Sequence, residues 1–386
     1  MNGSRAHPKQ NPKTPGDTPP EAPENPVVNR LKRRIKTDGA VSVAEFMATA
    51  LGDQDGGYYT TRDPFGASGD FTTSPEISQV FGELIGLWCA NTWQSMGSPS
   101  DFALIELGPG RGTLMADALR ALRHVPACRN AASLHLVETS PVLRDIQQNI
   151  LRGENVTWHS DLPDLGRTPV IFIANEFLDA LPVQQYIKLE GRWCERVVAF
   201  DDVHDRFCFA VNPVRQLPAR DITHQLVAAE EGSIFEHAPM VQGVVAAISH
   251  QLFRNGGAGL IIDYGHTRHS TGQTLQAIRR HRPVDPLETP GDSDLTAYVN
   301  FQLVGETATA AKTKVWGPVD QGVFLQKIGI VERANTLFKH ANFAQIHDIR
   351  TAITRLISPA EMGTLFKVMA ITDDRISHLA GFETDS

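Results

Sequence analysis

The sequence predicts an α/β fold built on a parallel sheet with helices on both faces. From residue 101 onward, short apolar runs of strand length alternate with segments of helical spacing, and this alternation is typical of parallel sheets. The apolar runs are nearly continuous, as expected of strands that are buried on both faces. The expected strands cover 102–107, 134–138, 170–174 and 259–264, and the expected helices between them include 114–122 and 141–151.

Composition and charge narrow the class of protein. The chain has 386 residues, of which 41% are hydrophobic and 21% charged, enough for one large α/β domain with insertions or for two domains. The formal net charge of -8 disfavours a protein that coats nucleic acid. No apolar run approaches the ~18–20 residues of a membrane-spanning helix. The four cysteines have no C-x-x-C spacing, so we expect no zinc knuckle, and buried thiols in a reducing, cytoplasmic compartment.

The N-terminal part is expected to form a tail and a helical segment. Residues 1–26 contain seven of the 24 prolines and almost no apolar side chains, so we expect a disordered tail. The basic cluster from Arg30 to Lys36 is either a solvated helix face or a docking site for an acidic partner. Residues 41–51 have helical spacing, and a further helix over 74–96 opens with Ser-Pro-Glu, which suits a helix N-terminus.

The rest of the chain adds insertions to the sheet. Aromatic and β-branched residues over 184–211 predict a β excursion, whereas the proline-rich, polar stretch 281–294 predicts a loop or lid. The C-terminal part is mostly helical, with last strands expected at 314–319 and 365–372. We therefore divide the folded part into a helical segment with an active-site loop (27–100), a Rossmann-like core (101–270), a lid with a helical insertion (271–360) and a last strand with a tail (361–386).

A glycine-rich turn follows the first expected strand. Gly108, Gly110 and Gly112 precede the helix over 114–122, where glycines let the backbone approach a ligand and the helix end offers free N–H groups. Such a turn would suit any nucleotide or dinucleotide. Glu106 on the preceding strand narrows the choice, because a carboxylate would repel a pyrophosphate and pair with a cationic ligand. S-adenosylmethionine carries a sulfonium and an ammonium group and has no phosphate.

Acids at the ends of the next two expected strands favour a nucleoside ligand. Glu138 stands 28 residues after Gly110 and can hydrogen-bond both ribose hydroxyls, as in dinucleotide folds; a solvated strand end is the alternative. Asp161 and Leu162 follow the third expected strand, where an acid and an apolar side chain could hold an adenine ring.

The fourth expected strand ends in a segment with two carboxylates. Ligands of open parallel sheets bind beyond the carboxyl ends of the strands, so Glu176 and Asp179 are candidates for the chemistry. A helical turn would place both side chains on one face. The alternative for Asp179 is a cap or a hydrogen bond to local backbone. A metal-dependent site is disfavoured, because only His266 and His269 of the fourteen histidines are near neighbours and no ligand triad is apparent.

Together these segments resemble the class I S-adenosylmethionine-dependent methyltransferases. More closely, the chain resembles the MidA family, which comprises mitochondrial complex I assembly-factor protein arginine methyltransferases and their bacterial relatives. The resemblance covers roughly residues 27–375 and implies a Rossmann-like core with a largely parallel, seven-stranded sheet. It rests on GDFTTSPEISQVFGELIG (69–86), ELGPGRGT (106–113), NEFLDALPV (175–183), LIIDYGH (260–266) and LQAIRRHRPVDPLETPGDSDLTAYVNF (275–301).

The resemblance also implies site residues and the cofactor S-adenosyl-L-methionine. Glu176 and Asp179 are the expected catalytic clamp, because paired carboxylates hold a planar guanidinium bidentately. Asp70, Phe71, Asp263 and Tyr264 are the expected substrate-binding residues, with Asp70 and Asp263 as alternatives for the clamp. The expected cofactor residues are Glu106, Gly108, Gly110 and Gly112, with Glu138 for the ribose, Asp161 and Leu162 for the adenine, and Asn175.

The expected function is therefore methylation of arginine in a protein, and the resemblance implies the quinone-side subunit of respiratory complex I as substrate. The location would be the cytoplasm of a bacterium or the mitochondrial matrix of a eukaryote, and exposed apolar helix faces could support a homodimer. A non-catalytic, cofactor-binding assembly factor is the alternative. A nucleic-acid amino-methyltransferase is disfavoured, because N-E-F-L at 175–178 replaces the usual N-P-P-aromatic turn.

One departure from the family pattern stands in the last motif. There the family reads D-L-T-A-H-V-D-F, whereas this chain has Tyr298 and Asn300 in place of the histidine and the second aspartate. These two positions either contact the substrate or pack within the fold.

Overall fold

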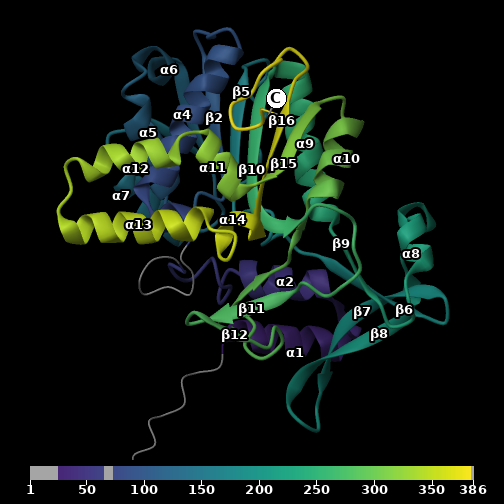
Figure 1. Cartoon of the computed structure of the whole chain (residues 1–386). Coiled ribbons are helices and arrows are strands. Elements are labelled where there is room, and N and C mark those ends of the chain that lie inside the picture. The colour runs from purple at the N-terminus through teal and green to yellow at the C-terminus, as the bar shows by residue number, and fades with distance from the viewer. Residues whose placement is uncertain (1–24, 65–72, 384–386) are drawn as a thin grey trace, which may run out of the picture.

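The computed structural model describes residues 25–64 and 73–383. A central sheet is wrapped by helices, and a smaller part of the chain lies below one edge of that sheet (Figure 1). Most of the expected tail over 1–26 lies outside the described residues, as do Asp70 and Phe71 of the expected substrate site. Within the two described ranges, every helix is too short or too polar to cross a membrane.

The strands of the central sheet are β2 (Phe102–Leu107), β3 (Ala132–Val137), β4 (Val156–His159), β5 (Val170–Asn175), β10 (Gly257–His266), β14 (Val299–Asn300), β15 (Lys314–Asp320) and β16 (Phe366–Thr372). Five of them are parallel neighbours in the order β10-β5-β2-β3-β4. β16 pairs antiparallel with β10 and with β15, and the short β14 joins β10. The expected class I fold is present, but its sheet is mixed and has eight strands, not seven.

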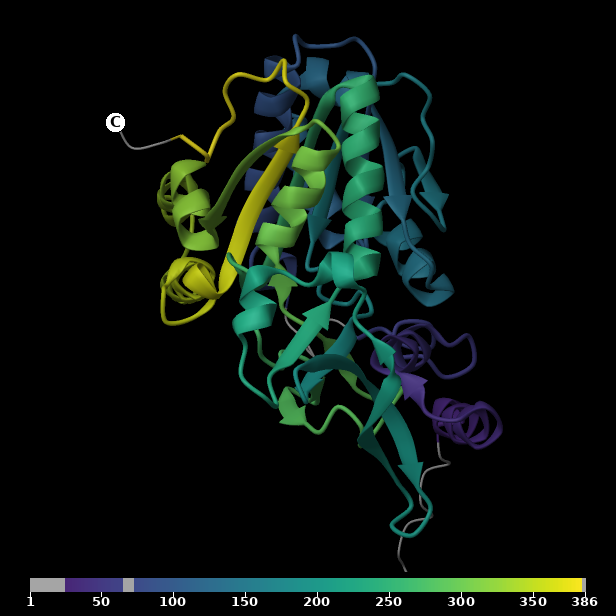
Figure 2. The same cartoon turned by 90° about the vertical axis from the view of Figure 1, so that its right-hand side faces the viewer.

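The helices that cover this sheet are α4 (Gln79–Ser95), α5 (Thr113–Leu122), α6 (Pro126–Ala131), α7 (Pro141–Ile150), α9 (Pro239–Asn255), α10 (Phe301–Ala310), α11 (Gln321–Lys327), α12 (Ile330–Phe338), α13 (Phe343–Ile357) and α14 (Met362–Leu365). Successive side chains of β2 point to opposite faces. Phe102 and Leu104 therefore pack with α4 and α5, whereas Ala103 and Ile105 pack with α9 and α10. Figure 2 shows α9 and α10 in front of the sheet. The two faces thus have separate hydrophobic cores.

The remaining elements form what we call the small module: α1 (Pro26–Asp38), β1 (Val41–Ser42), α2 (Val43–Gly52), β6 (Gln184–Leu189), β7 (Arg192–Asp201), β8 (Arg206–Gln216), a short 3-10 turn (Ala219–Asp221), α8 (His224–Ala228), β9 (Ile234–His237), β11 (Gln276–Arg279), β12 (Arg282–Val284) and β13 (Asp294–Thr296). Its two sheets run β1-β7-β6-β9, with β8 beside β7, and β12-β11-β13. The β excursion predicted over 184–211 is confirmed as β6, β7 and β8. Phe46, Val198 and Leu295 belong to the larger hydrophobic core of the module. A second, smaller cluster contains Trp193, Leu226 and Phe235.

Two expected helices differ from the structure at their ends. The helix expected over 41–51 begins only at Val43, because Val41 and Ser42 pair as β1 with β7. The helix expected over 74–96 is broken at Ser78, whose extended backbone (φ -158°, ψ 130°) separates α3 (Ser74–Ile77) from α4. The Ser78 hydroxyl then accepts a hydrogen bond from the Val80 N–H at 3.2 Å and so caps α4.

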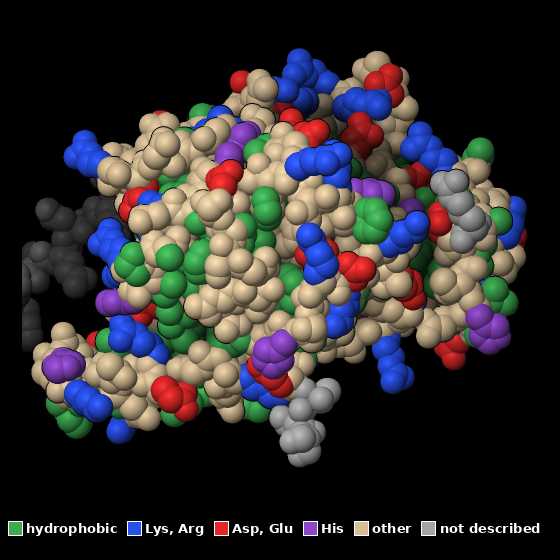
Figure 3. Space-filling model, turned by 90° about the horizontal axis from the view of Figure 1, so that it is seen from above, with side chains coloured by type: hydrophobic (Ala, Val, Ile, Leu, Met, Phe, Trp, Pro, Cys, Tyr) green, Lys and Arg blue, Asp and Glu red, His purple; other side chains and the backbone are tan. Residues whose placement is uncertain are grey.

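Ion pairs within the chain occupy most of the basic cluster that precedes β1. Lys32 pairs with Asp205, Lys36 with Asp202, and Arg34 with Glu45; Arg30 pairs with Asp53 at 2.9 Å. Exposed pairs of this kind add little stability, but they leave little of the cluster's charge for an acidic partner. On the face seen in Figure 3, described basic and acidic side chains are interspersed.

Buried groups away from the sheet edge have structural roles. All four cysteines are free thiols, and Cys89, Cys128 and Cys194 are buried, as the sequence predicts. Glu83 of α4 accepts hydrogen bonds from Arg120 of α5 at 3.0 Å and from Arg333 of α12 at 2.8 Å. This carboxylate therefore joins the C-terminal helices to the core.

Candidate active site

The glycine-rich turn between β2 and α5 has the backbone that only glycine adopts readily. Gly108, Gly110 and Gly112 have φ values of 59°, 53° and 85°, in the left-handed region that other residues disfavour. A Cβ atom on Gly108 would lie 2.7 Å from Cδ2 of Phe177, which is too close for two carbon atoms. Glycine at position 108 thus lets Phe177, in the segment that follows β5, approach the turn closely.

Glu106 is buried near the end of β2 and has one carboxylate oxygen without a hydrogen-bond partner in the described chain. Its side chain is 3% exposed, and its Oε2 atom has no hydrogen-bond partner among the described residues. Burial raises the pKa of this carboxyl to about 8. Asn175 Oδ1, at the end of the adjacent β5, is likewise buried without a partner in the described chain. Buried polar atoms are almost always hydrogen-bonded, so both oxygens fit a bound group that donates, such as an ammonium.

Glu138 is held at the end of β3 by a glutamine that the sequence analysis missed. The Ser140 N–H donates to Glu138 Oε1 at 2.8 Å. Gln147 Nε2 donates to Glu138 Oε2 at 3.2 Å and to the Gly110 carbonyl at 2.7 Å. The Trp158 indole N–H fixes Gln147 in turn. Gln147 and Leu143 are the buried residues of α7, so a glutamine on the apolar face of an amphipathic helix was the available signal.

Glu176 occupies a strained position directly after β5. Its φ of 49° is uncommon for a residue with a side chain. The Ser74 N–H donates to its Oε1 atom at 2.9 Å, and Asn175 Nδ2 donates to the same oxygen at 3.1 Å. Burial raises the pKa of Glu176 to about 7, and the charge of Asp179 acts in the same direction. The Glu176 carboxyl therefore changes between its protonated and its ionised form near neutral pH.

Asp179 lies three residues further on, in a turn that is not helical. It is 6% exposed, and burial raises its pKa to about 6. The helical geometry expected for 176–179 is therefore absent, although both carboxylates still face one cavity. The segment between β5 and β6 reaches the small module through a hydrogen bond from the Ala297 N–H to the Asp179 carbonyl, at 2.9 Å.

Asp263 holds this turn in place from β10. Its carboxylate accepts the N–H groups of Leu178 at 3.0 Å, Asp179 at 3.2 Å and Tyr264 at 2.9 Å. Asp263 is fully buried and does not line the cavity. Asp263, which was expected to bind substrate, therefore holds the turn in position and does not line the cavity. Its neighbour Tyr264 does line the cavity.

The segment 73–77 connects the N-terminal motif to the glycine turn. The Ser74 backbone reaches Glu176, as described above, and the Thr113 hydroxyl at the start of α5 donates to Glu76. The described part of the motif over 69–86 thus adjoins the site.

A cavity of about 350 Å³ collects most of these residues. Its wall includes Gly108 and Gly110 of the turn, Glu138, and Glu176, Asp179 and Tyr264. A smaller pocket beside it includes Glu106 and Asn175 together with Gly108, Gly110 and Glu176. The small module adds Tyr59 and Asp294 to the large cavity, and neither was among the expected site residues.

Three expected cofactor residues line neither the large cavity nor the smaller pocket beside it. Gly112 lies two residues after Gly110, and a Cβ atom added there would lie 3.3 Å from Cγ of Gln147. Asp161 is exposed in the loop after β4, and Leu162 is half-buried against the core beneath α9. Whether Asp161 and Leu162 bind an adenine ring therefore stays a prediction.

Tyr298 and Asn300 have roles in packing and capping. The Tyr298 ring packs edge-on against the Tyr264 ring, with centroids 5.4 Å apart. The Asn300 side chain accepts the Leu303 N–H at 3.1 Å and so caps α10, and its Nδ2 atom lies 2.9 Å from His269 Nδ1. Neither residue lines the cavity that holds Glu176 and Asp179.

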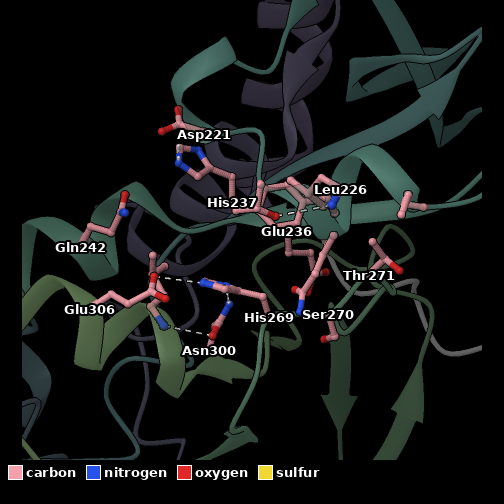
Figure 4. Close-up of a pocket in the computed structure, with 16 residues that line it drawn as sticks. Asp221, Leu226, Glu236, His237, Gln242, His269, Ser270, Thr271, Asn300 and Glu306 are labelled. Carbon is pink, nitrogen blue, oxygen red and sulfur yellow. Dashed lines mark hydrogen bonds and ion pairs between the residues drawn. The ribbon is translucent and has the colours of Figure 1, made fainter.

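A second cavity, of about 610 Å³, lies beside β9 and α10 (Figure 4). His269 there is paired with Glu306 at 3.0 Å, and His237 lies 4.0 Å from Asp221. None of the expected site residues lines this cavity. Among the described residues, no cluster of His, Cys, Asp and Glu could hold a metal ion.

Known proteins resemble this chain in sequence and structure. A family model described as "Putative S-adenosyl-L-methionine-dependent methyltransferase" matches residues 84–319. The chain is 37% identical to "Protein arginine methyltransferase NDUFAF7 homolog, mitochondrial" of Drosophila melanogaster, over 89% of this chain and 84% of that protein. The Homo sapiens protein arginine methyltransferase NDUFAF7 is 34% identical, over 92% and 85%. A Burkholderia thailandensis crystal structure with bound S-adenosyl-homocysteine has a TM-score of 0.79 at 28% identity, over 92% of this chain and 93% of that one.

Proposed function

The chain belongs to this family of S-adenosyl-L-methionine-dependent methyltransferases, and from that premise we propose that it methylates the guanidinium group of arginine in a protein substrate. The observation that carries the proposal is the wall of the 350 Å³ cavity. Glu138, Glu176, Asp179 and Asp294 all line it, and its described wall includes no lysine or arginine. Such a cavity fits a cationic acceptor beside a cationic cofactor.

We assign the cofactor to the end of the sheet where the glycine turn lies. Glu106 would accept the ammonium group, which supplies the partner that Oε2 lacks within the described chain. Glu138, fixed by Gln147, would accept the ribose hydroxyls. The glycine turn would admit the ligand to the backbone, and Asp161 with Leu162 would flank the adenine. When bound, the cofactor supplies an electrophilic methyl group on its sulfonium.

Glu176 and Asp179 would bind the guanidinium and orient one of its nitrogens. Carboxylates are bidentate acceptors for this planar cation. The attacking nitrogen must lose a proton as the methylated product forms, and a carboxyl with a pKa of about 7 can accept it near neutral pH. Asp263 would position both residues through the three N–H groups that it accepts.

The partner and the location follow from the same resemblance. We propose the quinone-side subunit of respiratory complex I as the protein substrate, in the cytoplasm of a bacterium or the mitochondrial matrix of a eukaryote. The curated relatives named above are called mitochondrial and the solved structure is bacterial, so they are compatible with either location. A homodimer stays a prediction; Phe343 on α13, 89% exposed, is one apolar side chain that it would cover.

Formation of S-adenosylhomocysteine tests the proposal. The full chain is incubated with S-adenosylmethionine and protein extract from cells that lack it, beside a Glu176→Gln variant. We expect product with the wild type only, and equal binding of S-adenosylhomocysteine by both proteins, because Glu176 faces the acceptor. Binding without product formation by either protein would favour the cofactor-binding assembly factor instead, and full activity of the variant would remove Glu176 from the mechanism.

A further inference from the structure

The acceptor cavity has a second acidic wall, which the small module provides. Glu176, Asp179 and Tyr264 line the side that belongs to the central sheet, whereas Asp294 and Tyr59 line the side of the small module. Asp294 is the first residue of β13 and is 5% exposed. Tyr59 lies in the segment after α2. Tyr59 and Asp294 each lie more than 100 residues from Glu176 and Asp179 in the sequence.

Tyr59 orients Asp294 and lies close to both walls. Its hydroxyl donates a hydrogen bond to Asp294 Oδ1 at 2.8 Å. Burial raises the pKa of the Tyr59 phenol, and the charges of Asp294 and then Asp179 raise it further. The spacing of the two aspartates is fixed by the backbone, because the Ala297 N–H just after β13 donates to the Asp179 carbonyl.

Tyr264 adds a buried hydroxyl to the same cavity, beside Asp179. Tyr264 is 7% exposed and lines the cavity. Its hydroxyl adjoins Asp179 and Thr296 but forms no well-directed hydrogen bond within the described residues. Buried hydroxyls are normally satisfied. The acidic residues of the two walls therefore indicate a ligand that is cationic and has several N–H donors, and the Tyr264 hydroxyl lies where it can also accept one of them.

We propose that Asp294 is a substrate-binding residue, that Tyr59 is its positioning residue, and that the guanidinium of the acceptor is held between Asp294 and the Glu176–Asp179 pair. The inference rests on the proposed function and adds a reason for arginine over lysine. A guanidinium is planar and has five N–H donors along two edges, so it can contact acids on opposite walls. A lysine ammonium concentrates three donors at one point and contacts one wall well.

Binding of simple acceptor probes tests this assignment. The full chain, saturated with S-adenosylhomocysteine, is titrated calorimetrically with N-acetyl-L-arginine amide and with N-acetyl-L-lysine amide. We expect wild type to prefer the arginine probe, and Asp294→Asn to bind it about 10- to 100-fold more weakly, the loss expected for a charge-assisted hydrogen bond. Tyr59→Phe should weaken binding of the arginine probe less than Asp294→Asn does. The double variant should bind the probe as weakly as Asp294→Asn alone, because Tyr59 acts through Asp294.

Asp292→Asn is the matched control. Asp292 lies two residues before Asp294, accepts a hydrogen bond from Arg62 at 2.7 Å, and does not line the cavity. It should leave both probes unaffected. Affinity for S-adenosylhomocysteine should be unchanged in all variants, and this result shows that the fold and the cofactor site are intact. If Asp294→Asn does not fold, Tyr59→Phe is used for the test instead, because it retains the aromatic ring and removes only the hydroxyl.

The outcomes separate this inference from the proposed function. An arginine preference that survives Asp294→Asn and Tyr59→Phe would overturn the role of the small module and leave the proposed function standing. An equal loss in Asp292→Asn would also overturn it. A wild type that binds neither probe, or that prefers lysine, would overturn the arginine acceptor itself and this inference with it.

Discussion

If Glu106 holds the ammonium group of the cofactor, S-adenosylhomocysteine should bind more tightly at pH 7 than at pH 6. The carboxyl must be ionised to pair with a cation, and burial gives it a pKa of about 8 in the unliganded protein. With that value, about one-tenth of the groups are ionised at pH 7 and about one-hundredth at pH 6. The apparent affinity should therefore rise about ninefold over this interval, and binding at pH 7 should release about 0.9 proton.

Calorimetric titration in two buffers of different ionisation enthalpy measures both quantities. Glu106→Gln should remove this pH dependence and weaken binding about tenfold at pH 7.5. Glu195→Gln is the control, because Glu195 on β7 is 4% exposed, pairs with Arg215, and lines neither the large cavity nor the pocket beside it. Binding that is independent of pH in the wild type, or a pH dependence that persists in Glu106→Gln, would refute the assignment of Glu106.

Three further predictions concern the turn, the helices and the family departure. Gly108→Ala and Gly166→Ala should each destabilise the fold by about 1–2 kcal/mol, because both glycines have positive φ. Only the new Cβ of Gly108→Ala would collide with Phe177, so only this variant should lose S-adenosylhomocysteine binding in calorimetry. Equal binding by the two variants would contradict this. Burial tends to raise the pKa of Glu83, but its two arginine partners lower it overall. Glu83→Gln should thus destabilise the protein by about 1–3 kcal/mol at pH 7, as measured in thermal melts. The difference in stability between wild type and variant should disappear as the pH falls below about 4, where Glu83 becomes protonated. A difference that stays constant at all pH values would exclude the ion pairs. Asn300→Asp keeps the cap of α10 and changes only the group that faces His269, so the protein should fold and its cofactor affinity should not change; weaker binding would place this position in contact with the site.

The central sheet could be predicted because its strands are buried on both faces. β2 and β5 are buried at all six positions, and such strands are continuous apolar runs in the sequence. Acids directly after strand ends could likewise be placed at one edge of the sheet, which is why Glu138, Glu176 and Asp179 come together in one cavity.

Features that depend on contacts distant in the sequence could not be predicted. Tyr59 and Asp294 reach the cavity only because the small module folds over the sheet edge. Asp263 lies near the carboxyl end of β10, but its buried carboxylate accepts three N–H groups and does not line the cavity. The helix expected over 74–96 is interrupted at Ser78, where the backbone is extended although the local sequence favours an unbroken helix.

The amino acid that receives the methyl group is the most direct test of the account. The full chain is incubated with S-adenosylmethionine labelled in its methyl group and with protein extract from cells that lack the chain, and the labelled protein is hydrolysed and separated by chromatography. The account predicts label in methylarginine with the wild type, and none with Glu176→Gln. Label in methyllysine or in a base-labile carboxyl ester would contradict it, because the acidic cavity would then not select a guanidinium.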